Sequence, residues 1–308
     1  MEAELLRIML YFDIFNYPLT RREIVSYSSL ERDRWKEVKS TLARMVKEGV
    51  IGFYRGFYYV GRQRQNVTSR LEGNRRMKKR MRTARRYSGI ISGFPFVRGV
   101  FISGSLSKGA VSETDDIDYF IITDPGRLWL VRSLLTLFKK MFLLNSYRNF
   151  CINYFVDSEN LYVRDHNLFT ATEIVFLIPV FNRVIYDRFM DQNTWVRSYY
   201  PNIVRRDDFC HERNPVIKRL LEKLPGNSTG NRLESYFYRT SGSYIRRKFS
   251  YMDDKTFSQS FTLLRNELKY LPQRHKNRII DKYNERVLKF RRLNWFTPVK
   301  IPVHSLSE

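Results

Sequence analysis

Two short polar motifs, ten residues apart, carry the side chains of this sequence that could perform chemistry. They are Gly104-Ser105 and Asp116-Ile117-Asp118. Strand side chains alternate between two faces, so Asp116 and Asp118 are predicted to lie on one side of a strand. Two neighbouring carboxylates repel each other unless a cation lies between them, and Mg²⁺ prefers such oxygen ligands. The Gly-Ser turn offers backbone N–H groups and has no Cβ at Gly104, so a phosphate can approach closely. The two motifs therefore predict a site for a metal-bound nucleoside triphosphate.

The elements that must position these motifs are two apolar runs typical of β-strands. One run, 97–102, ends at the Gly-Ser turn, and the other, 117–123, begins inside the acidic motif. A polar loop joins them. We expect this strand-loop-strand unit to bring the turn and the two acids to one shared pocket.

The spacing of these residues resembles the signature of the polymerase β-type nucleotidyltransferase superfamily. The resemblance covers roughly residues 95–160, and Ser103 departs from it because an apolar residue is more usual there. It implies an α+β fold: a nucleotidyltransferase-fold mixed sheet with flanking helices. It also implies an enzyme that moves a nucleoside monophosphate from a nucleoside triphosphate to an acceptor hydroxyl and releases pyrophosphate.

The resemblance also implies roles for individual residues. Asp116 and Asp118 would be catalytic and would bind two Mg²⁺ ions. Gly104 and Ser105 would hold the phosphates of the nucleotide, and Lys108 would offset their charge. The acceptor stays open among an RNA end, a protein hydroxyl, a small molecule and a second nucleotide.

A third carboxylate, which the family takes from a later strand as general base, has no obvious counterpart in this sequence. The polar position of the expected strand at 151–156 is Asn153, which cannot act as a base. Asp157 follows four residues later, shares a face with Asn153 in an ideal strand, and is the catalytic candidate, with Asp115 the other acid nearby. Three alternatives are open. Asp157 acts as the third carboxylate, Asn153 binds metal through its amide oxygen for an acceptor that needs no base, or the enzyme has weakened activity.

Glu173 lies in an otherwise apolar segment. It either caps a helix or pairs internally, or it contacts the nucleotide.

The charge of the chain points to polyanions. Lys and Arg number 55 against 31 Asp and Glu, a formal net charge of +24 at pH 7. Such a field attracts nucleic acid first and anionic membrane surfaces second. Residues 62–86 form the most basic run, which is either a phosphate track or a solvated linker helix. The candidates there for nucleic-acid contact are Arg75, Arg76, Lys78, Lys79 and Arg82.

Four segments are predicted along the chain: a winged-helix-like domain (1–61), a basic helical connector (62–94), a nucleotidyltransferase catalytic domain (95–190) and a helical C-terminal region (191–308). The first segment has three helical patterns and then a hairpin that turns near Arg55-Gly56, an order similar to that of a winged helix-turn-helix. Such a module either reads DNA or has a structural or docking role. A non-catalytic, nucleic-acid-binding regulator that keeps the fold as a scaffold or nucleotide sensor is therefore the alternative function.

The location expected from the sequence is the cytoplasm. Two cysteines make no disulfide framework, and the charged N-terminus does not resemble a signal peptide. The most hydrophobic segment, 128–144, contains Arg132, Lys139 and Lys140 and is too short to span a bilayer. We therefore expect no membrane insertion.

Overall fold

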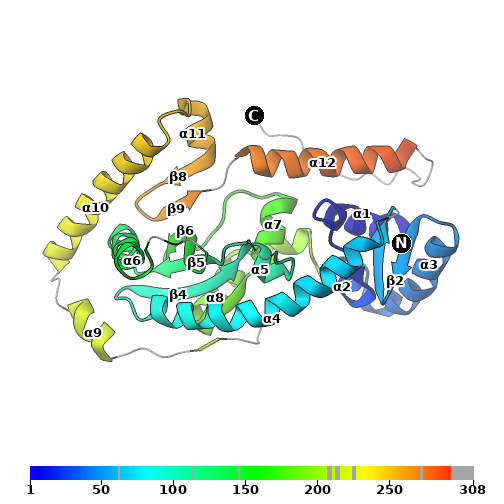
Figure 1. The fold of residues 1–308 in the computed structure, drawn as a ribbon, viewed down its shortest axis with the longest axis horizontal. Coiled ribbons are helices and arrows are strands. Elements are labelled where there is room, and N and C mark those ends of the chain that lie inside the picture. The colour runs from blue at the N-terminus through cyan, green and yellow to red at the C-terminus, as the bar shows by residue number, and fades with distance from the viewer. Residues whose placement is uncertain are drawn as a thin grey trace.

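The centre of the molecule is a mixed sheet of six strands in the order β7-β4-β5-β6-β9-β8 (Figure 1). The computed structural model describes residues 1–292 except 62, 113, 145, 147, 207–209, 212–215, 224–226 and 271–272. The strands are β4 (Val97–Ser103), β5 (Asp118–Thr123), β6 (Cys151–Asp157), β7 (Ile178–Phe181), β8 (Phe261–Leu263) and β9 (Glu267–Tyr270). β5 and β6 run parallel, and the other neighbours run antiparallel. The expected α+β class is confirmed.

The N-terminal segment folds into three α-helices and a small sheet of order β1-β3-β2. Its elements are α1 (Glu2–Asp13), β1 (Leu19–Thr20), α2 (Arg21–Tyr27), the 3₁₀ turn η1 (Arg32–Arg34), α3 (Trp35–Lys47), β2 (Ile51–Tyr54) and β3 (Phe57–Val60). α2 begins with a capping box, because the hydroxyl of Thr20 accepts from the Glu23 amide and the Glu23 carboxylate accepts from the Thr20 amide. Arg55 and Gly56 both take positive φ, as a tight hairpin turn requires.

The long helix α4 (Gln65–Ser92) leads from this segment along one side of the central sheet (Figure 1). The remaining helices are α5 (Gly104–Lys108), α6 (Leu128–Phe142), α7 (Leu168–Val175), α8 (Arg183–Gln192), the 3₁₀ turn η2 (Thr194–Ser198), α9 (Val216–Lys223), α10 (Asn227–Lys248), α11 (Asp254–Ser260) and α12 (Gln273–Arg292).

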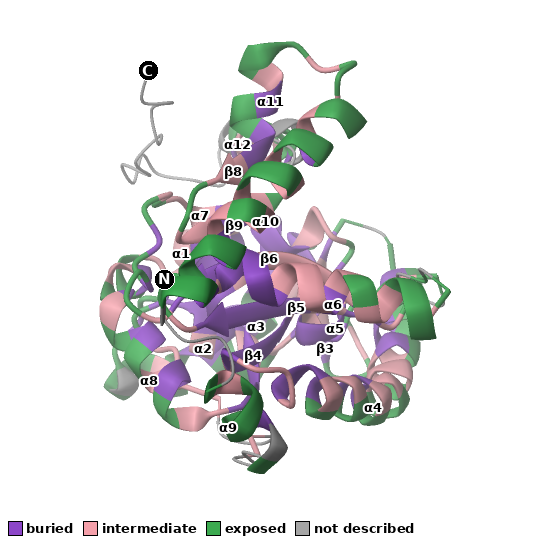
Figure 2. Ribbon diagram, turned by 90° about the vertical axis from the view of Figure 1, so that its left-hand side faces the viewer, coloured by how far each residue is buried: buried purple, intermediate pink, exposed green. Residues whose placement is uncertain are grey.

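Alternation along the strands divides the buried side chains between two hydrophobic cores. Figure 2 shows the central strands mostly in the colour of buried residues. Phe120 and Ile122 of β5 belong to a core shared with α1, α7, α8 and α12. Tyr119 and Ile121 belong to a second core, shared with α4, α6, α10 and α11. Because Asp118 alternates with Tyr119, it lies on the same face as Phe120, toward the N-terminal segment.

The C-terminal segment is not purely helical, which corrects the expected organisation of 191–308. Hairpin β8–β9 extends the central sheet, with Phe155 of β6 opposite Leu268 of β9. These strands have three and four residues, too few to show an alternating pattern in the sequence. The central sheet therefore takes strands from beyond residue 190. Residues 293–308 lie outside the described residues.

The N-terminal segment shares its core with the rest of the chain. The ring centroids of Phe12 and Phe176 are 6.0 Å apart, and Tyr27 lies 5.5 Å from Phe176 and 6.0 Å from Tyr200. Residues 1–61 are therefore packed as part of a common core, not held only by the connector. Within the described ranges, no helix has both the length and the apolar run that crossing a bilayer requires.

Replacing Phe12 should destabilise the whole molecule. Phe12 is 3% exposed, so Phe12→Ala is expected to lower the free energy of unfolding by about 3–5 kcal/mol. Phe53, which is 50% exposed, supplies the control, and Phe53→Ala should cost under about 1 kcal/mol. Urea unfolding followed by circular dichroism and by tryptophan fluorescence measures both. An early transition confined to the N-terminal segment would contradict the shared core.

Candidate functional site

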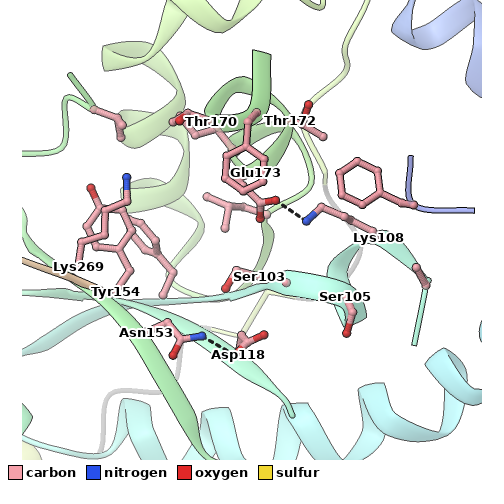
Figure 3. Close-up of a pocket in the computed structure, with 18 of the residues that line it drawn as sticks. Ser103, Ser105, Lys108, Asp118, Asn153, Tyr154, Thr170, Thr172, Glu173 and Lys269 are labelled. Atoms are coloured by element: carbon pink, nitrogen blue, oxygen red, sulfur yellow. Dashed lines mark hydrogen bonds and ion pairs between the residues drawn. The ribbon is translucent and has the colours of Figure 1, made fainter. Parts of the chain in front are cut away.

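A cavity of about 590 Å³ opens on the face of the sheet that carries Phe120 (Figure 3). Four of the predicted site residues line it: Gly104, Ser105, Lys108 and Asp118. The sheet supplies its floor, α5 and α7 supply two of its sides, and Phe12, Phe15 and Tyr17 supply a wall from the N-terminal segment. The structure therefore brings the Gly-Ser turn and one of the two predicted acids into one pocket.

Gly104 lies directly against the carboxylate of Asp118. Ser103 pairs with Asp118 across β4 and β5, so the turn begins opposite the acid. Gly104 has φ +68°, and a Cβ at this residue would lie 2.2 Å from Oδ2 of Asp118. Both the backbone conformation and the contact thus require glycine.

The environment of Asp118 favours its protonated form. Burial raises the pKa of the carboxyl to about 6, and the negative charges of Asp116 and Glu173 add to the increase. Hydrogen bonds from Cys151 and Asn153 act in the opposite direction. Asn153 Nδ2 donates to Asp118 Oδ1 over 2.5 Å. A cation or a positively charged ligand would therefore stabilise the ionised carboxylate.

Asp116 is exposed and precedes β5, which begins at Asp118. Its neighbour Ile117 is fixed from both sides, since its amide donates to the carbonyl of Arg148 and its carbonyl accepts from the amide of Cys151. Asp116 therefore lies at the edge of the site, close enough to influence Asp118 but outside the residues that line the cavity.

A β-bulge places Asn153 in the site. Asp118 pairs with Cys151 and Tyr119 with Ile152, but Phe120 pairs with Tyr154. β6 thus has one extra residue at this point, and both Asn153 and Tyr154 line the cavity.

Asp157, the predicted catalytic third acid, is not part of the site. It pairs with Thr123, five residues along β5 from Asp118. Its Oδ1 accepts from the amides of Glu159 and Asn160, and from Asn160 Nδ2. The prediction assumed an ideal strand, whereas the bulge changes the alternation between Asn153 and Asp157. The carboxylate closes the turn after β6 at the far end of the strand.

Lys108 points into the cavity but is engaged by an acid there. Its Nζ lies 2.5 Å from Oε1 of Glu173, on α7. The carbonyl of Lys108 accepts from the Tyr17 hydroxyl and, over 3.3 Å, from Arg70 Nη1. Glu173 forms an internal pair, one of the two roles open from the sequence, and it does so inside the candidate site.

Aromatic side chains make much of the cavity, and the sequence did not reveal them as a group. Phe120 and Tyr154 pack edge to face on the floor with centroids 4.4 Å apart. Lys269, opposite Tyr154 in the sheet, has its ammonium 5.5 Å from that ring. Burial lowers the pKa of Lys269. Phe12, Phe120, Tyr154 and Lys269 are distant in the chain, so no local pattern links them.

The five basic residues predicted to contact nucleic acid lie on α4, outside the residues that line the cavity. Arg75, Lys78, Lys79 and Arg82 are exposed and, at helical spacing, lie along one side of the helix. Arg76 is half-buried and pairs with Glu72 over 3.2 Å. Arg75, Lys78, Lys79 and Arg82 thus form an exposed basic stripe that is separate from the pocket.

The donor set suits a cation that draws ligands from its substrate. In the described part of the chain, no group of three or more His, Cys, Asp or Glu side chains gathers as a metal centre. Asp118 and its neighbour Asp116 supply carboxylate oxygens, whereas Asn153 directs its Nδ2 at Asp118 and its amide oxygen accepts from Sγ of Cys151. Mg²⁺ commonly binds through one or two carboxylates together with substrate phosphates, so the two carboxylates fit it.

No family model, no curated protein and no solved structure matches this chain. The function is therefore argued from the geometry of the cavity.

Gly104→Ala should destabilise the protein. The substitution puts a side chain at φ +68° and drives its Cβ into the Asp118 carboxylate, so we expect a loss of about 2 kcal/mol or more. Gly89→Ala is the control, because nothing lies within 4 Å of the added Cβ on the exposed side of α4. It should be neutral or stabilising by up to about 1 kcal/mol. Equal losses in the two variants would contradict the contact.

Asp118→Asn should stabilise the metal-free protein at high pH. The folded pKa of about 6 exceeds the ordinary 3.8, so the proton on Asp118 contributes stability below pH 3.8 that is lost as the pH rises through about 6. At pH 8 the ionised carboxylate costs about 3 kcal/mol, which the variant recovers. Urea unfolding in EDTA at pH 4 and pH 8 measures this, with the exposed Asp281→Asn as control. A gain that does not change with pH would contradict the raised pKa.

Proposed function

We propose that this protein is a metal-dependent nucleotidyltransferase that moves a nucleoside monophosphate from a nucleoside triphosphate to an acceptor hydroxyl and releases pyrophosphate. The observation that supports it is the contact between Gly104 and the Asp118 carboxylate in a cavity of about 590 Å³. A turn without a side chain beside a half-buried acid is what a phosphate bridged to a cation needs.

The proposed roles follow from the contacts. Asp118 and Asp116 would hold two Mg²⁺ ions, and Asn153 would orient Asp118 through its hydrogen bond. Bound Mg²⁺ would offset charge on the phosphates and on the attacking and leaving oxygens. Gly104 and Ser105 would orient the phosphates. The protein would contribute positioning and charge stabilisation, with no covalent intermediate.

The walls favour a compact acceptor with an apolar or aromatic body. The volume is in the range of small-molecule sites, about 300–1,000 Å³. Phe12, Phe15 and Phe169 border it together with Tyr154, and such surfaces gain free energy by covering apolar groups. We assign the N-terminal segment to the winged-helix type on its element order, with the added role of forming this wall. We place the protein in the cytoplasm, where nucleoside triphosphates and Mg²⁺ are available.

The basic stripe on α4 supports a second candidate, a nucleic-acid-binding regulator. Arg75, Lys79 and Arg82 are exposed on one side of the helix, and unneutralised cations at this spacing attract a phosphate backbone. In that case the cavity would serve as a nucleotide sensor or scaffold.

One assay distinguishes the two functions. The protein is incubated with Mg²⁺ or Mn²⁺ and each α-³²P-labelled nucleoside triphosphate, with RNA, protein and small-molecule fractions as acceptors. Label incorporation by the wild type should fall by at least about 10³-fold in Asp116→Ala/Asp118→Ala. Arg75→Gln/Lys79→Gln/Arg82→Gln, which alters only the stripe, should keep incorporation into a small acceptor. Absence of incorporation, together with salt-sensitive duplex binding that only the stripe variant loses, would favour the regulator.

A further inference from the structure

The cavity contains an acid that the predicted mechanism does not use. Among the described residues that line it, the acidic side chains are Asp118 and Glu173. Asn153 occupies the bulge beside Asp118, and Asp157 lies at the far end of β6. An acceptor hydroxyl inside the cavity therefore has one carboxylate available besides the proposed metal ligand.

We propose that Glu173 is the general base for the acceptor and that Lys108 covers it until the triphosphate of the nucleotide draws Lys108 away. This inference rests on the proposed function. It assigns Glu173 as a catalytic residue. Glu173 becomes available only after the nucleoside triphosphate has drawn Lys108 away from it.

The position of Glu173 suits this role. Figure 3 shows Glu173 on one side of the group of lining residues and Asp118 and Asn153 on the other, with Ser103 between them in this view. Glu173 projects from α7, whereas Asp118 projects from β5. Its charge nevertheless reaches Asp118, because it contributes to the raised pKa of that group. A hydroxyl between the two sides would face the phosphate site on one side and a base on the other.

The ion pair can exchange partners without movement of the main chain. The Lys108 carbonyl is held by the Tyr17 hydroxyl and by Arg70, and Arg70 Nη1 also donates to the Gly109 carbonyl over 3.0 Å. The four-carbon stem of the lysine remains flexible. Lys108 follows Ser105 by three residues, and a triphosphate carries more negative charge than one carboxylate. Its arrival would attract the ammonium toward the turn and leave the Glu173 side chain without its ion-pair partner.

The transfer step then balances. The acceptor O–H bond breaks and its proton moves to a carboxylate oxygen of Glu173. The acceptor oxygen forms a bond to the α-phosphorus, and the bond from that phosphorus to the bridging oxygen of the β-phosphate breaks. Pyrophosphate leaves with that electron pair. No oxidation or reduction takes place, and the proton on Glu173 passes to solvent after release.

The alternative is that Glu173 only anchors Lys108. The two roles differ in what Glu173→Gln does to binding and to turnover. If Glu173 both competes with the nucleotide for Lys108 and acts as the base, Glu173→Gln should bind the nucleotide more tightly and react more slowly. A simple anchor should leave binding weaker or unchanged and turnover little affected.

The binding test uses calorimetric titration with Mg²⁺ and a non-hydrolysable α,β-methylene nucleoside triphosphate. Glu173→Gln is expected to bind about three- to tenfold more tightly than wild type. The substitution removes the carboxylate that competes for Lys108, and the free energy gained should be similar to that of one ion pair. Lys108→Met should bind more weakly by a similar factor. Glu72→Gln is the matched control, because it breaks the Glu72–Arg76 pair on the exposed side of α4, and its affinity should not change.

The turnover test follows pyrophosphate release from each nucleoside triphosphate, with the RNA, protein and small-molecule fractions of the incorporation assay as acceptors. Glu173→Gln should lower kcat by about 10²–10⁴-fold, Glu173→Asp should retain part of the rate, and Glu72→Gln should match wild type. Tighter binding together with the lost rate supports the proposal.

The outcomes that overturn the proposal are separable. Unchanged or weaker nucleotide binding by Glu173→Gln rejects the covering role of Lys108, and an unchanged kcat rejects the base. Either result leaves the proposed function intact if wild type releases pyrophosphate and Asp116→Ala/Asp118→Ala does not. Wild type that binds no nucleotide, or releases no more pyrophosphate than that double variant, rejects the proposed function and this inference together.

Discussion

The buried guanidinium of Arg70 is the contact on which the arrangement of the site depends. One nitrogen donates to Asn74 and to the carbonyl of Gly109, and the other donates to Glu23 in the N-terminal segment over 2.8 Å. The same group lies 3.7 Å from the centroid of the Tyr17 ring. An arginine remains charged and presents its donors in a fixed fork, so it can join several groups that a lysine could not. It thereby fixes α4, the N-terminal segment and the C-terminal end of α5 relative to one another.

The β-bulge in β6 determines which polar groups accompany Asp118. Because one extra residue enters the strand between Ile152 and Tyr154, the amide of Asn153 faces the carboxylate and Tyr154 still contributes its ring to the floor. Next to the Gly-Ser turn, the site consequently combines one half-buried acid with a neutral amide. The other charged groups near it come from elsewhere in the fold, among them the Lys108–Glu173 pair, which joins α5 to α7.

The N-terminal segment has a structural consequence beyond its own fold. Its aromatic residues extend the core of the sheet and close one side of the cavity, so the pocket exists only in the assembled chain. Packing of this kind removes apolar surface from water and also limits the shape of what can enter. The basic stripe on α4, by contrast, faces outward, so this basic surface is separate from the pocket.

Local sequence determined the parts of this protein that depend on neighbouring residues. The spacing of Gly104-Ser105 and Asp118 between two apolar runs predicted their convergence, because a strand-turn-strand unit constrains its own ends. Tertiary structure decided what lies around them. The prediction for Asp157 assumed ideal alternation along β6 and was wrong, because the amino-acid composition of a strand does not reveal a bulge. Phe12, Glu173 and Lys269 meet at the cavity from distant segments, since only the packing of α1, α7 and β9 against the sheet brings them together.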